Sequence, residues 1–253
     1  MNSLDVGNAL LYGIPITLSA GMYGGFDCLL ARRNQPVDPA PHGAARRPNL
    51  VSLSADSAIH IVVAKSRDQL EAVADLVRGR YAWRGYEFPD GDVATSEAQR
   101  RSSQEITFLA ATGRRAIGTL TLGLDGSAGL LAEGSYGEVI AEFRAAGHRV
   151  CELTRLALAE SIDSKAVLAA LFSLAHAAGR TLDDVTHVFI EVNPRHVAFY
   201  SRVLGFVVAA GEKFCERVRA RSVLLQLEIE SFEERLMALG GEAVVKPLIA
   251  EAA

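Results

Sequence analysis

The apolar positions of this chain follow two periods, one typical of strands and one typical of helices. Strand patterns occur at 58–64, 105–111, 116–124, 149–159, 185–192, 206–210 and 219–229. Helical spacing occurs at 66–81, 136–147, 163–179, 193–205 and from 231 to about 239. Because strands alternate with helices at both ends, with a hairpin near 112–115 between, the pattern predicts an α/β fold. In this fold a single mixed central sheet has flanking helices and forms a three-layer sandwich.

The chain is predicted to have three parts. These are an N-terminal segment and proline-rich linker at 1–56, a catalytic-size domain at 57–230, and a C-terminal helix and tail at 231–253. Residues 34–49 hold four of the eight prolines and show no apolar periodicity, which is typical of a linker. The apolar stretch 9–33 is interrupted by Pro15, Asp27 and glycines. We therefore expect a short extended element there, packed on the core, and neither a membrane span nor a secretory signal.

Two predicted helices carry capping signals. Ser66 is placed to cap the first of them. The helix at 163–179 has Asp163 or Ser164 at its start, and Gly179 is expected to end it.

Composition limits the class of protein. With 49% hydrophobic residues, 22% charged residues and a formal net charge of -4, the chain is typical of a globular protein without a nucleic-acid face. The three cysteines form no C-x-x-C pair, which indicates reduced thiols in the cytoplasm, and Cys151 is expected in the core. The histidines lack metal-ligand spacing, so no metal is expected.

The strand at 149–159 carries two charges, Glu152 and Arg155, in an apolar setting. A buried ion without compensation costs several kcal/mol, so these residues must pair, bind a ligand or lie at an open end. Residues three apart in a regular strand point to opposite faces. If both serve one site, we expect a bulge that re-aims one of them. A structural Glu-Arg pair at the strand edge is the alternative interpretation.

The stretch 191-EVNPRHVAFYSRVLGF-206 also allows two interpretations. Asn193 stands where a helix cap belongs, Gly205 is the expected stop, and Tyr200 lies on the apolar face. In the structural interpretation Asn193 is only a cap and Tyr200 only a core residue. In the functional one Tyr200 is a general acid above a cleft, and Asn193 donates to a ligand amide or carbonyl.

Three motifs together resemble a known family. The sequence 193-NPRHVAFYSRVLGF-206 resembles the last motif of the GCN5-related N-acyltransferase fold, and 152-ELTR-155 resembles the signature of acyl-homoserine-lactone synthases. With 80-RYAWRGYEF-88 and 223-VLLQLEI-229, they resemble the long-chain N-acyl amino acid synthases over roughly residues 57–230.

The resemblance implies a transfer from a fatty acyl thioester, usually on acyl carrier protein, to the amine of an amino acid. Glu152 matches the residue that handles the acceptor amine, and Arg155 matches its signature partner. Arg155 is expected either to bind the carboxylate of the acceptor or to orient Glu152. Tyr200 matches the tyrosine that protonates the leaving thiolate, and Asn193 the residue near the pantetheine arm. No cofactor is expected to stay bound, since the acyl-phosphopantetheine thioester is a co-substrate.

Further substrate contacts are expected from the aromatic stretch, at Arg80, Trp83 and Tyr86. From residue type alone, an apolar slot for the acyl chain is expected from Trp83, Tyr86, Phe108 and Phe172. Lys165, near a helix start that follows the charged strand, is placed to help bind the phosphate of the phosphopantetheine.

One departure from the fold's acetyl-CoA-dependent members favours a carrier-protein donor. The stretch 160-ESIDSKAVLAAL-171 lacks the glycines that cradle the CoA pyrophosphate in those members. An acetyl-CoA-dependent N-acetyltransferase and a catalytically inactive acyl-binding module on the same fold are the alternatives.

Overall fold

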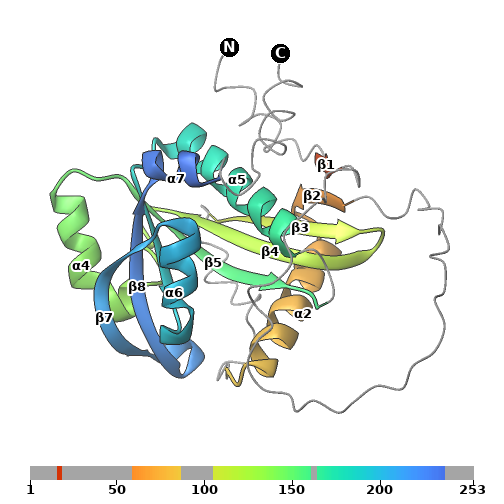
Figure 1. The fold of residues 1–253 in the computed structure, drawn as a ribbon, viewed down its shortest axis with the longest axis horizontal. Helices are drawn as coiled ribbons and strands as arrows, with labels where there is room; N and C mark the ends of the chain where they lie inside the picture. Colours follow the sequence, from red (N-terminus) through yellow and green to blue (C-terminus); the bar gives the residue numbers. More distant parts are fainter. Residues whose placement is uncertain (1–15, 19–58, 87–104, 161–163, 237–253) are drawn as a thin grey trace, which may run out of the picture.

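The structure, a computed structural model, describes residues 16–18, 59–86, 105–160 and 164–236. In this part of the chain an eight-stranded sheet has the order β1-β2-β3-β4-β5-β6-β8-β7 (Figure 1). The strands are β1 Ile16–Leu18, β2 Ile59–Val63, β3 Glu105–Thr112, β4 Arg115–Leu124, β5 Val150–Leu158, β6 His187–Val192, β7 Val207–Cys215 and β8 Ala220–Glu228. Neighbouring strands are antiparallel except β5 and β6, which are parallel. The sheet is therefore mixed, as the sequence predicts.

Helices cover both faces of the sheet. They are α2 Arg67–Trp83, α4 Glu133–Ala145, α5 Ser164–Asp183, α6 Val197–Phe199 and α7 Ile229–Leu236. Figure 1 shows α5 and α7 on one side of the sheet and α2 and α4 on the other. This arrangement confirms the predicted three-layer sandwich.

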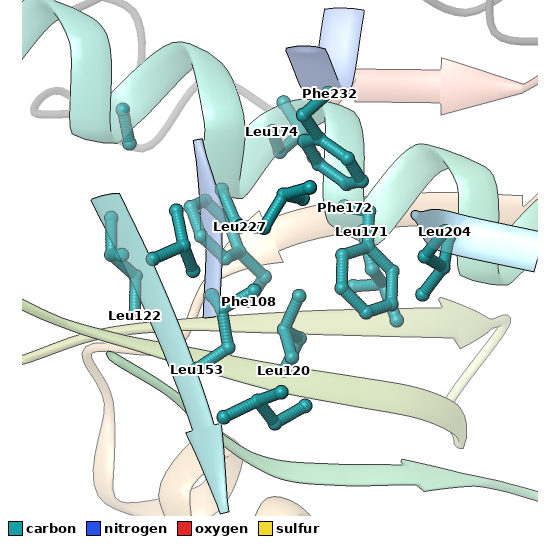
Figure 2. Packing of buried hydrophobic residues seen from close by; sticks show 14 of the residues in the cluster. Phe108, Leu120, Leu122, Leu153, Leu171, Phe172, Leu174, Leu204, Leu227 and Phe232 are labelled. Carbon is teal, nitrogen blue, oxygen red and sulfur yellow. The ribbon is translucent and has the colours of Figure 1, made fainter. Parts of the chain in front are cut away.

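The largest apolar cluster lies between the sheet and the pair α5 and α7 (Figure 2). Phe108 and Leu120 from the sheet meet Leu171 and Phe172 from α5, and all four side chains are fully buried. Gly118 in β4 allows this close packing, because a Cβ atom there would lie 2.7 Å from Cγ1 of Val167. The α5 face is thus a continuous apolar core.

On the opposite face the apolar contacts form two smaller clusters. Under α2, Val73 and Val77 pack on Leu109 and Ala157. Under α4, a separate cluster contains Leu130, Ala132, Tyr136, Ile140, Val150, Phe189 and Leu224. Polar side chains occupy the sheet between these two clusters, and the site is built from them.

Local signals in the sequence agree with the structure in most places. Ser66 forms a capping box with Gln69 at the start of α2, as its position predicts. Gly113, with φ of 55°, turns the chain between β3 and β4. The prediction that Gly179 ends its helix is wrong, because α5 continues to Asp183. The extra turn places Leu182 against the main core cluster, which outweighs the modest helix cost of a glycine.

The segment after β6 is less regular than its helical spacing suggests. It consists of a 3-10 turn at Pro194–His196, one α-helical turn at Val197–Phe199 and a π-helical turn at Tyr200–Leu204. Gly205, with φ of 84°, ends it as expected. Single π-helical turns within helices occur frequently at functional sites.

The apolar N-terminal stretch contributes one described strand. β1 pairs antiparallel with β2 at the edge of the sheet, so residues 16–18 are an extended element on the core domain. Asp163, the other suggested cap of α5, and Phe88 lie outside the described residues. None of the helices described here is both long enough and apolar enough to cross a membrane.

Candidate active site

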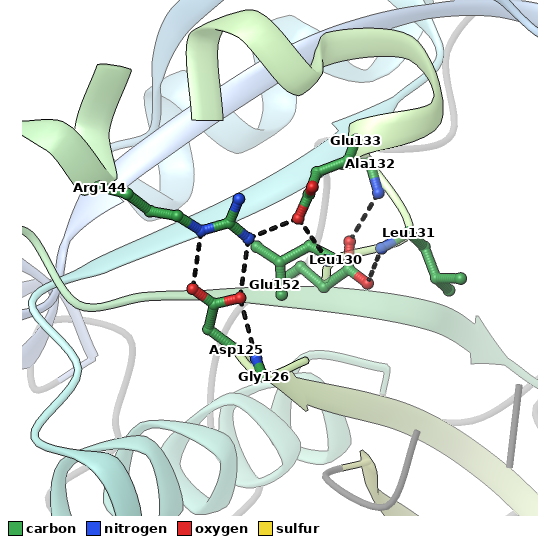
Figure 3. Close-up of polar contacts among 8 residues, drawn as sticks. All are labelled: Asp125, Gly126, Leu130, Leu131, Ala132, Glu133, Arg144 and Glu152. Atoms are coloured by element: carbon green, nitrogen blue, oxygen red, sulfur yellow. Dashed lines mark hydrogen bonds and ion pairs between the residues drawn. The ribbon is translucent and has the colours of Figure 1, made fainter. Parts of the chain in front are cut away.

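Glu152 is a buried carboxylate in the middle of the sheet, and its side chain is only 4% exposed. Its Oε1 accepts the main-chain N–H of Leu131 at 2.7 Å, and its Oε2 accepts that of Ala132 at 3.0 Å (Figure 3). Gly123 faces Glu152 across β4 and β5, where a Cβ would lie 3.1 Å from Cγ of Glu152. The sequence therefore leaves room for this carboxylate and supplies two donors to it.

Burial raises the pKa of Glu152 above the ordinary glutamate range. The N–H groups of Leu131 and Ala132 and the charge of Arg217 oppose this effect in part. A carboxylate with a raised pKa holds a proton more readily than an exposed one, as a general base for an ammonium group requires. Each oxygen keeps a second lone pair, so the two N–H contacts leave room for a ligand donor.

The loop that donates to Glu152 is itself held by an ion cluster (Figure 3). Arg144 in α4 bonds Asp125 at 2.7 and 2.8 Å and also pairs with Glu133. Glu133 accepts the N–H of Leu130 at 2.6 Å, and the bond from Arg144 lowers the pKa of Glu133. Both carboxylates therefore fix the start of α4, where the two donors to Glu152 lie.

Arg155 lies on a bulge, as the sequence analysis predicts. Thr154 pairs with Thr121 and Ala157 pairs with Thr119, so two residues of β5 oppose a single residue of β4. Arg155 is the first of these two, with φ of 52°. Its guanidinium bonds Glu105 at 2.7 Å, and Glu105 in turn raises the pKa of Glu152. The bulge thus directs Arg155 to the face of the sheet that carries Glu152.

The alternative of a structural Glu-Arg pair is not what the structure shows. Arg155 pairs with Glu105, whereas Glu152 accepts main-chain N–H groups. Arg155 is compensated by Glu105, which lies 50 residues away in the chain. Glu152 is compensated by main-chain N–H groups that lie 20 and 21 residues away.

The parallel pair of strands separates next to Glu152. β5 and β6 pair only from Val150 with His187 to Glu152 with Phe189, although both strands continue. Beyond this point the main chain of β5 is no longer matched to β6. An opening in a sheet of this kind gives main-chain groups that can bind an extended ligand.

Arg217 is a functional candidate that the sequence analysis did not identify. It lies in the turn Glu216–Val218 between β7 and β8 and bonds Glu191 of β6 at 3.0 Å. The side chain of Glu191 is 6% exposed, whereas that of Arg217 is 36% exposed. No motif or apolar period marks this turn, so only the fold reveals that Arg217 reaches the same face as Glu152.

The end of α2 contacts the turn after β6. Tyr86 receives a hydrogen bond from Arg195 at 3.0 Å and packs edge-on against Tyr81 at 5.5 Å between ring centres. Arg84 contacts His196 at 3.3 Å, and burial with the two neighbouring arginines lowers the pKa of His196 to about 4. The aromatic stretch and the Asn-Pro motif, far apart in the sequence, are therefore neighbours.

Tyr200 is 8% exposed and packs against Phe199 and Phe206. Burial raises the pKa of its hydroxyl, and the nearby Tyr81 and Tyr86 raise it further. Burial raises the pKa of Tyr81, and the nearby charges of Arg217 and Arg155 offset part of that rise. Tyr81 thus connects Tyr200, which belongs to the cluster on the α5 face, with the charged groups on the other face.

The expected acyl slot is not formed by the four aromatic residues suggested for it. Phe108 and Phe172 are fully buried in the main core. Trp83 is 65% exposed, with the guanidinium groups of Arg80 and Arg84 at 4.8 and 5.2 Å from its ring. Residue type alone could not separate core aromatics from surface ones.

The remaining predicted residues are placed less decisively. Asn193 accepts the N–H of Arg195 at 3.2 Å and donates to the carbonyl of Arg221 at 3.3 Å, so it is the expected cap. Lys165 is exposed in the first turn of α5. Cys151 is buried in the core, as expected, and burial raises the pKa of its thiol.

The mixed sheet, whose parallel strands separate beside Glu152, has the GCN5-related N-acyltransferase fold. The model of the FeeM family, described as N-acyl amino acid synthase FeeM, matches residues 72–228, which is more than half of the chain. The protein therefore belongs to this family of acyltransferases.

A solved structure of a family member supports the fold. The structure of FeeM, an N-acyl amino acid synthase from uncultured soil microbes, superposes with a TM-score of 0.61 at 22% identity and covers 70% of this chain and 93% of that one. The acyl-homoserine-lactone synthase LasI gives a TM-score of 0.48 at 15% identity, with 68% and 86% covered. No curated protein matches the sequence.

Proposed function

We propose that the protein transfers a long-chain fatty acyl group from acyl carrier protein to the amine of an amino acid. The observation that carries this proposal is Glu152, a buried carboxylate with a raised pKa at the point where β5 and β6 separate. Membership of the N-acyl amino acid synthase family supplies the reaction class. The described cysteines are free and buried, which fits a reducing cytoplasm.

The proposed reaction is a direct aminolysis of the thioester. Glu152 accepts a proton from the acceptor's ammonium group, and the free amine attacks the acyl carbon. Main-chain N–H groups of β5 beyond Glu152 stabilise the oxyanion. The carbon–sulfur bond then breaks as the amide forms. Of the two protons that the nitrogen loses, one ends on the sulfur and the other passes to solvent.

Tyr200 is the proposed donor to the leaving sulfur. Its raised pKa keeps the phenol protonated throughout the neutral range. A phenol is a weaker acid than an ordinary thiol, so proton transfer to a solvated thiolate would be unfavourable. Burial destabilises a thiolate that departs into the site just as it destabilises a phenolate. The difference in pKa between the phenol and the thiol is therefore smaller there than in water. We therefore assign to Tyr200 a hydrogen bond that strengthens as charge develops on the sulfur.

A carrier protein is the proposed donor because the start of α5 lacks a glycine-rich loop for a pyrophosphate, while cationic groups surround the end of α2. Arg84 and Arg195 are exposed there, beside Tyr86. Carrier proteins present an acidic surface and a single phosphate, which such groups can meet. We propose that Asn193, Lys165 and the residues near Tyr86 contact the pantetheine arm.

The test is to incubate the purified protein with palmitoyl carrier protein, palmitoyl-CoA or acetyl-CoA and a mixture of the twenty amino acids. We expect N-palmitoyl amino acids by mass spectrometry, with the carrier-protein donor preferred. Product from acetyl-CoA alone would replace this proposal by an N-acetyltransferase. Absence of any N-acyl product with every donor would refute it.

A further inference from the structure

A second charged group lies on the face of the sheet that carries Glu152. Glu191 of β6 is buried, receives the hydroxyl of Ser222 at 2.7 Å and pairs with Arg217 at 3.0 Å. Tyr136 donates to the main-chain carbonyl of Ser222 at 2.7 Å, which helps to position the residue whose hydroxyl bonds Glu191. Arg217 is thereby fixed at one end of its guanidinium.

Arg217 lies within electrostatic reach of Glu152. Phe189 is the last β6 residue that pairs beside Glu152, and Glu191 follows it by two positions on the same face of the strand. Because Arg217 is bonded to Glu191, its guanidinium lies on the face of the sheet that carries Glu152. Burial raises the pKa of Glu152, and the charge of Arg217 offsets part of that rise.

Arg217 has donors to offer to a ligand. Among the described residues, its hydrogen bond to Glu191 uses Nη2 alone, although a guanidinium carries five N–H donors. More than a third of its side chain is exposed, unlike the carboxylate that it pairs with. Nearby on β5, the hydroxyl of Thr154 is buried without a hydrogen-bond partner in the structure. Both features are typical of groups that a bound polar molecule completes.

We infer that Arg217 binds the α-carboxylate of the acceptor amino acid while Glu152 receives its ammonium group. This inference rests on the proposed function and names the recognition element of the same site. A guanidinium binds a carboxylate in a bidentate way, and the ammonium lies one carbon away from that carboxylate. The two charges of the acceptor thus match Glu152 on β5 and Arg217, which is anchored to Glu191 on the adjacent, separating strand β6.

Arg155, which the sequence suggests for this role, is less suitable. Its guanidinium bonds Glu105, and its side chain is only 14% exposed. A ligand carboxylate would have to displace a partner that is itself largely buried. At Arg217 the ligand approaches the exposed side of a guanidinium whose pairing with Glu191 can persist.

The experiment compares ligands with and without the carboxylate. The probes are N-dodecanoyl-L-phenylalanine and N-dodecanoyl-phenethylamine, which differ only in that group, and binding is measured by calorimetry. We expect the natural protein to bind the acid about 10- to 100-fold more tightly, as a charge-assisted bidentate bond provides. Arg217→Ala should reduce this preference to near unity, whereas Arg217→Lys should keep part of it.

Arg221→Ala is the matched control. Arg221 lies in the same hairpin and also pairs with a glutamate, Glu212, but its side chain is 75% exposed. This variant should keep the full preference for the acid. If Arg217→Ala fails to fold because Glu191 loses its partner, the double variant Arg217→Ala with Glu191→Gln removes both charges and is measured instead.

The outcomes separate this inference from the proposed function. Equal preference for the acid in the natural protein and in the Arg217 variants would overturn the inference, as would the absence of any preference in the natural protein. Because binding is measured without turnover, these results are independent of product formation. Absence of N-acyl product with every donor would instead count against the proposed function.

Discussion

On one face of the sheet α5 and α7 cover a continuous apolar cluster, whereas on the other face α2 and α4 leave charged side chains between their two separate clusters. Leu171 and Phe172 on the first face are fully buried members of the apolar core cluster. Glu152 on the second face is as deeply buried, yet it is bonded to main-chain N–H groups. The apolar core on the first face stabilises the domain. This stability offsets the cost of burying a carboxylate on the second face.

The two faces meet where β5 and β6 separate. Tyr200 packs in the apolar cluster of the α5 face, but its pKa responds to Tyr81 of α2. A sheet that stayed paired along both strands would separate these groups. The comparison therefore predicts that substitutions on the α5 face change stability, and substitutions on the other face change chemistry.

Glu152→Gln is expected to have the largest effect on turnover. The amide keeps the shape of the side chain but cannot accept the proton of the ammonium, and loss of a general base slows reactions by roughly 10²–10⁴-fold. The measurement is kcat with acyl carrier protein and the preferred amino acid, alongside the melting temperature. An unchanged kcat would exclude Glu152 as the base.

The same variant tests the burial of Glu152 through pH. Its folded pKa is raised, so the ionised base forms only above the ordinary glutamate pKa of ~4.3, and kcat should show an acid limb above that value. Stability has the opposite dependence: the contribution of Glu152 is fully present below the unfolded pKa and is lost as pH rises through the folded pKa. The free energy of unfolding of the natural protein should therefore fall relative to Glu152→Gln as pH increases. A constant difference between the two proteins would contradict the raised pKa.

Leu171→Ala tests the apolar face. Leu171 is fully buried in α5, so its truncation removes transfer free energy and leaves a cavity, at a cost of about 2–5 kcal/mol. Denaturant unfolding should show this loss, while kcat per folded molecule should change little. A selective loss of kcat without loss of stability would show that the two faces do not divide their roles in this way.

Tyr200→Phe is expected to have a smaller effect on turnover than Glu152→Gln. It removes one hydrogen bond to the leaving sulfur and keeps the ring contacts with Phe199 and Phe206, so we expect a reduction of kcat by roughly 10- to 100-fold. An oxygen ester donor, whose leaving group has a higher pKa than a thiol, should be affected more strongly. Equal rates for Tyr200→Phe and the natural protein would leave Tyr200 with its core role alone.

The sequence predicts the architecture well because each element has a local cause. Apolar periods define the strands and helices, and Ser66 and Gly205 define ends. The bulge at Arg155 is expected if Glu152 and Arg155 serve one site. The site is predicted in part for the same reason, since Glu152 stands out against its apolar neighbours. Its true partners, the N–H groups at the start of α4, follow from no side chain and could not be read from the sequence.

Long-range pairing is where sequence reasoning fails. Arg217 lies in a turn without a motif, and its relation to Glu191 and Glu152 arises only when β7 and β8 fold beside β6. Trp83 and Phe108 are both aromatic residues, but Trp83 is exposed and Phe108 is buried. Their burial depends on the position along a helix and on the face of a strand, which residue type alone does not give. The end of α5 was misplaced because the packing of Leu182 is a tertiary effect.

Ser66→Ala is expected to have the smallest effect and sharpens the comparison on the face with the site. The hydroxyl of Ser66 accepts the N–H of Gln69 at 3.2 Å, and Gln69 bonds back to the N–H of Ser66 at 3.0 Å. Loss of this cap should cost about 1 kcal/mol, which unfolding by urea can detect. Tyr81 lies at the opposite end of α2, held by Tyr86 and the turn after β6, so kcat should stay within about twofold. A large loss of kcat would instead mean that weakening the start of α2 also displaces Tyr81 at its other end. The contacts of Tyr81 would then not be sufficient to hold the site in place.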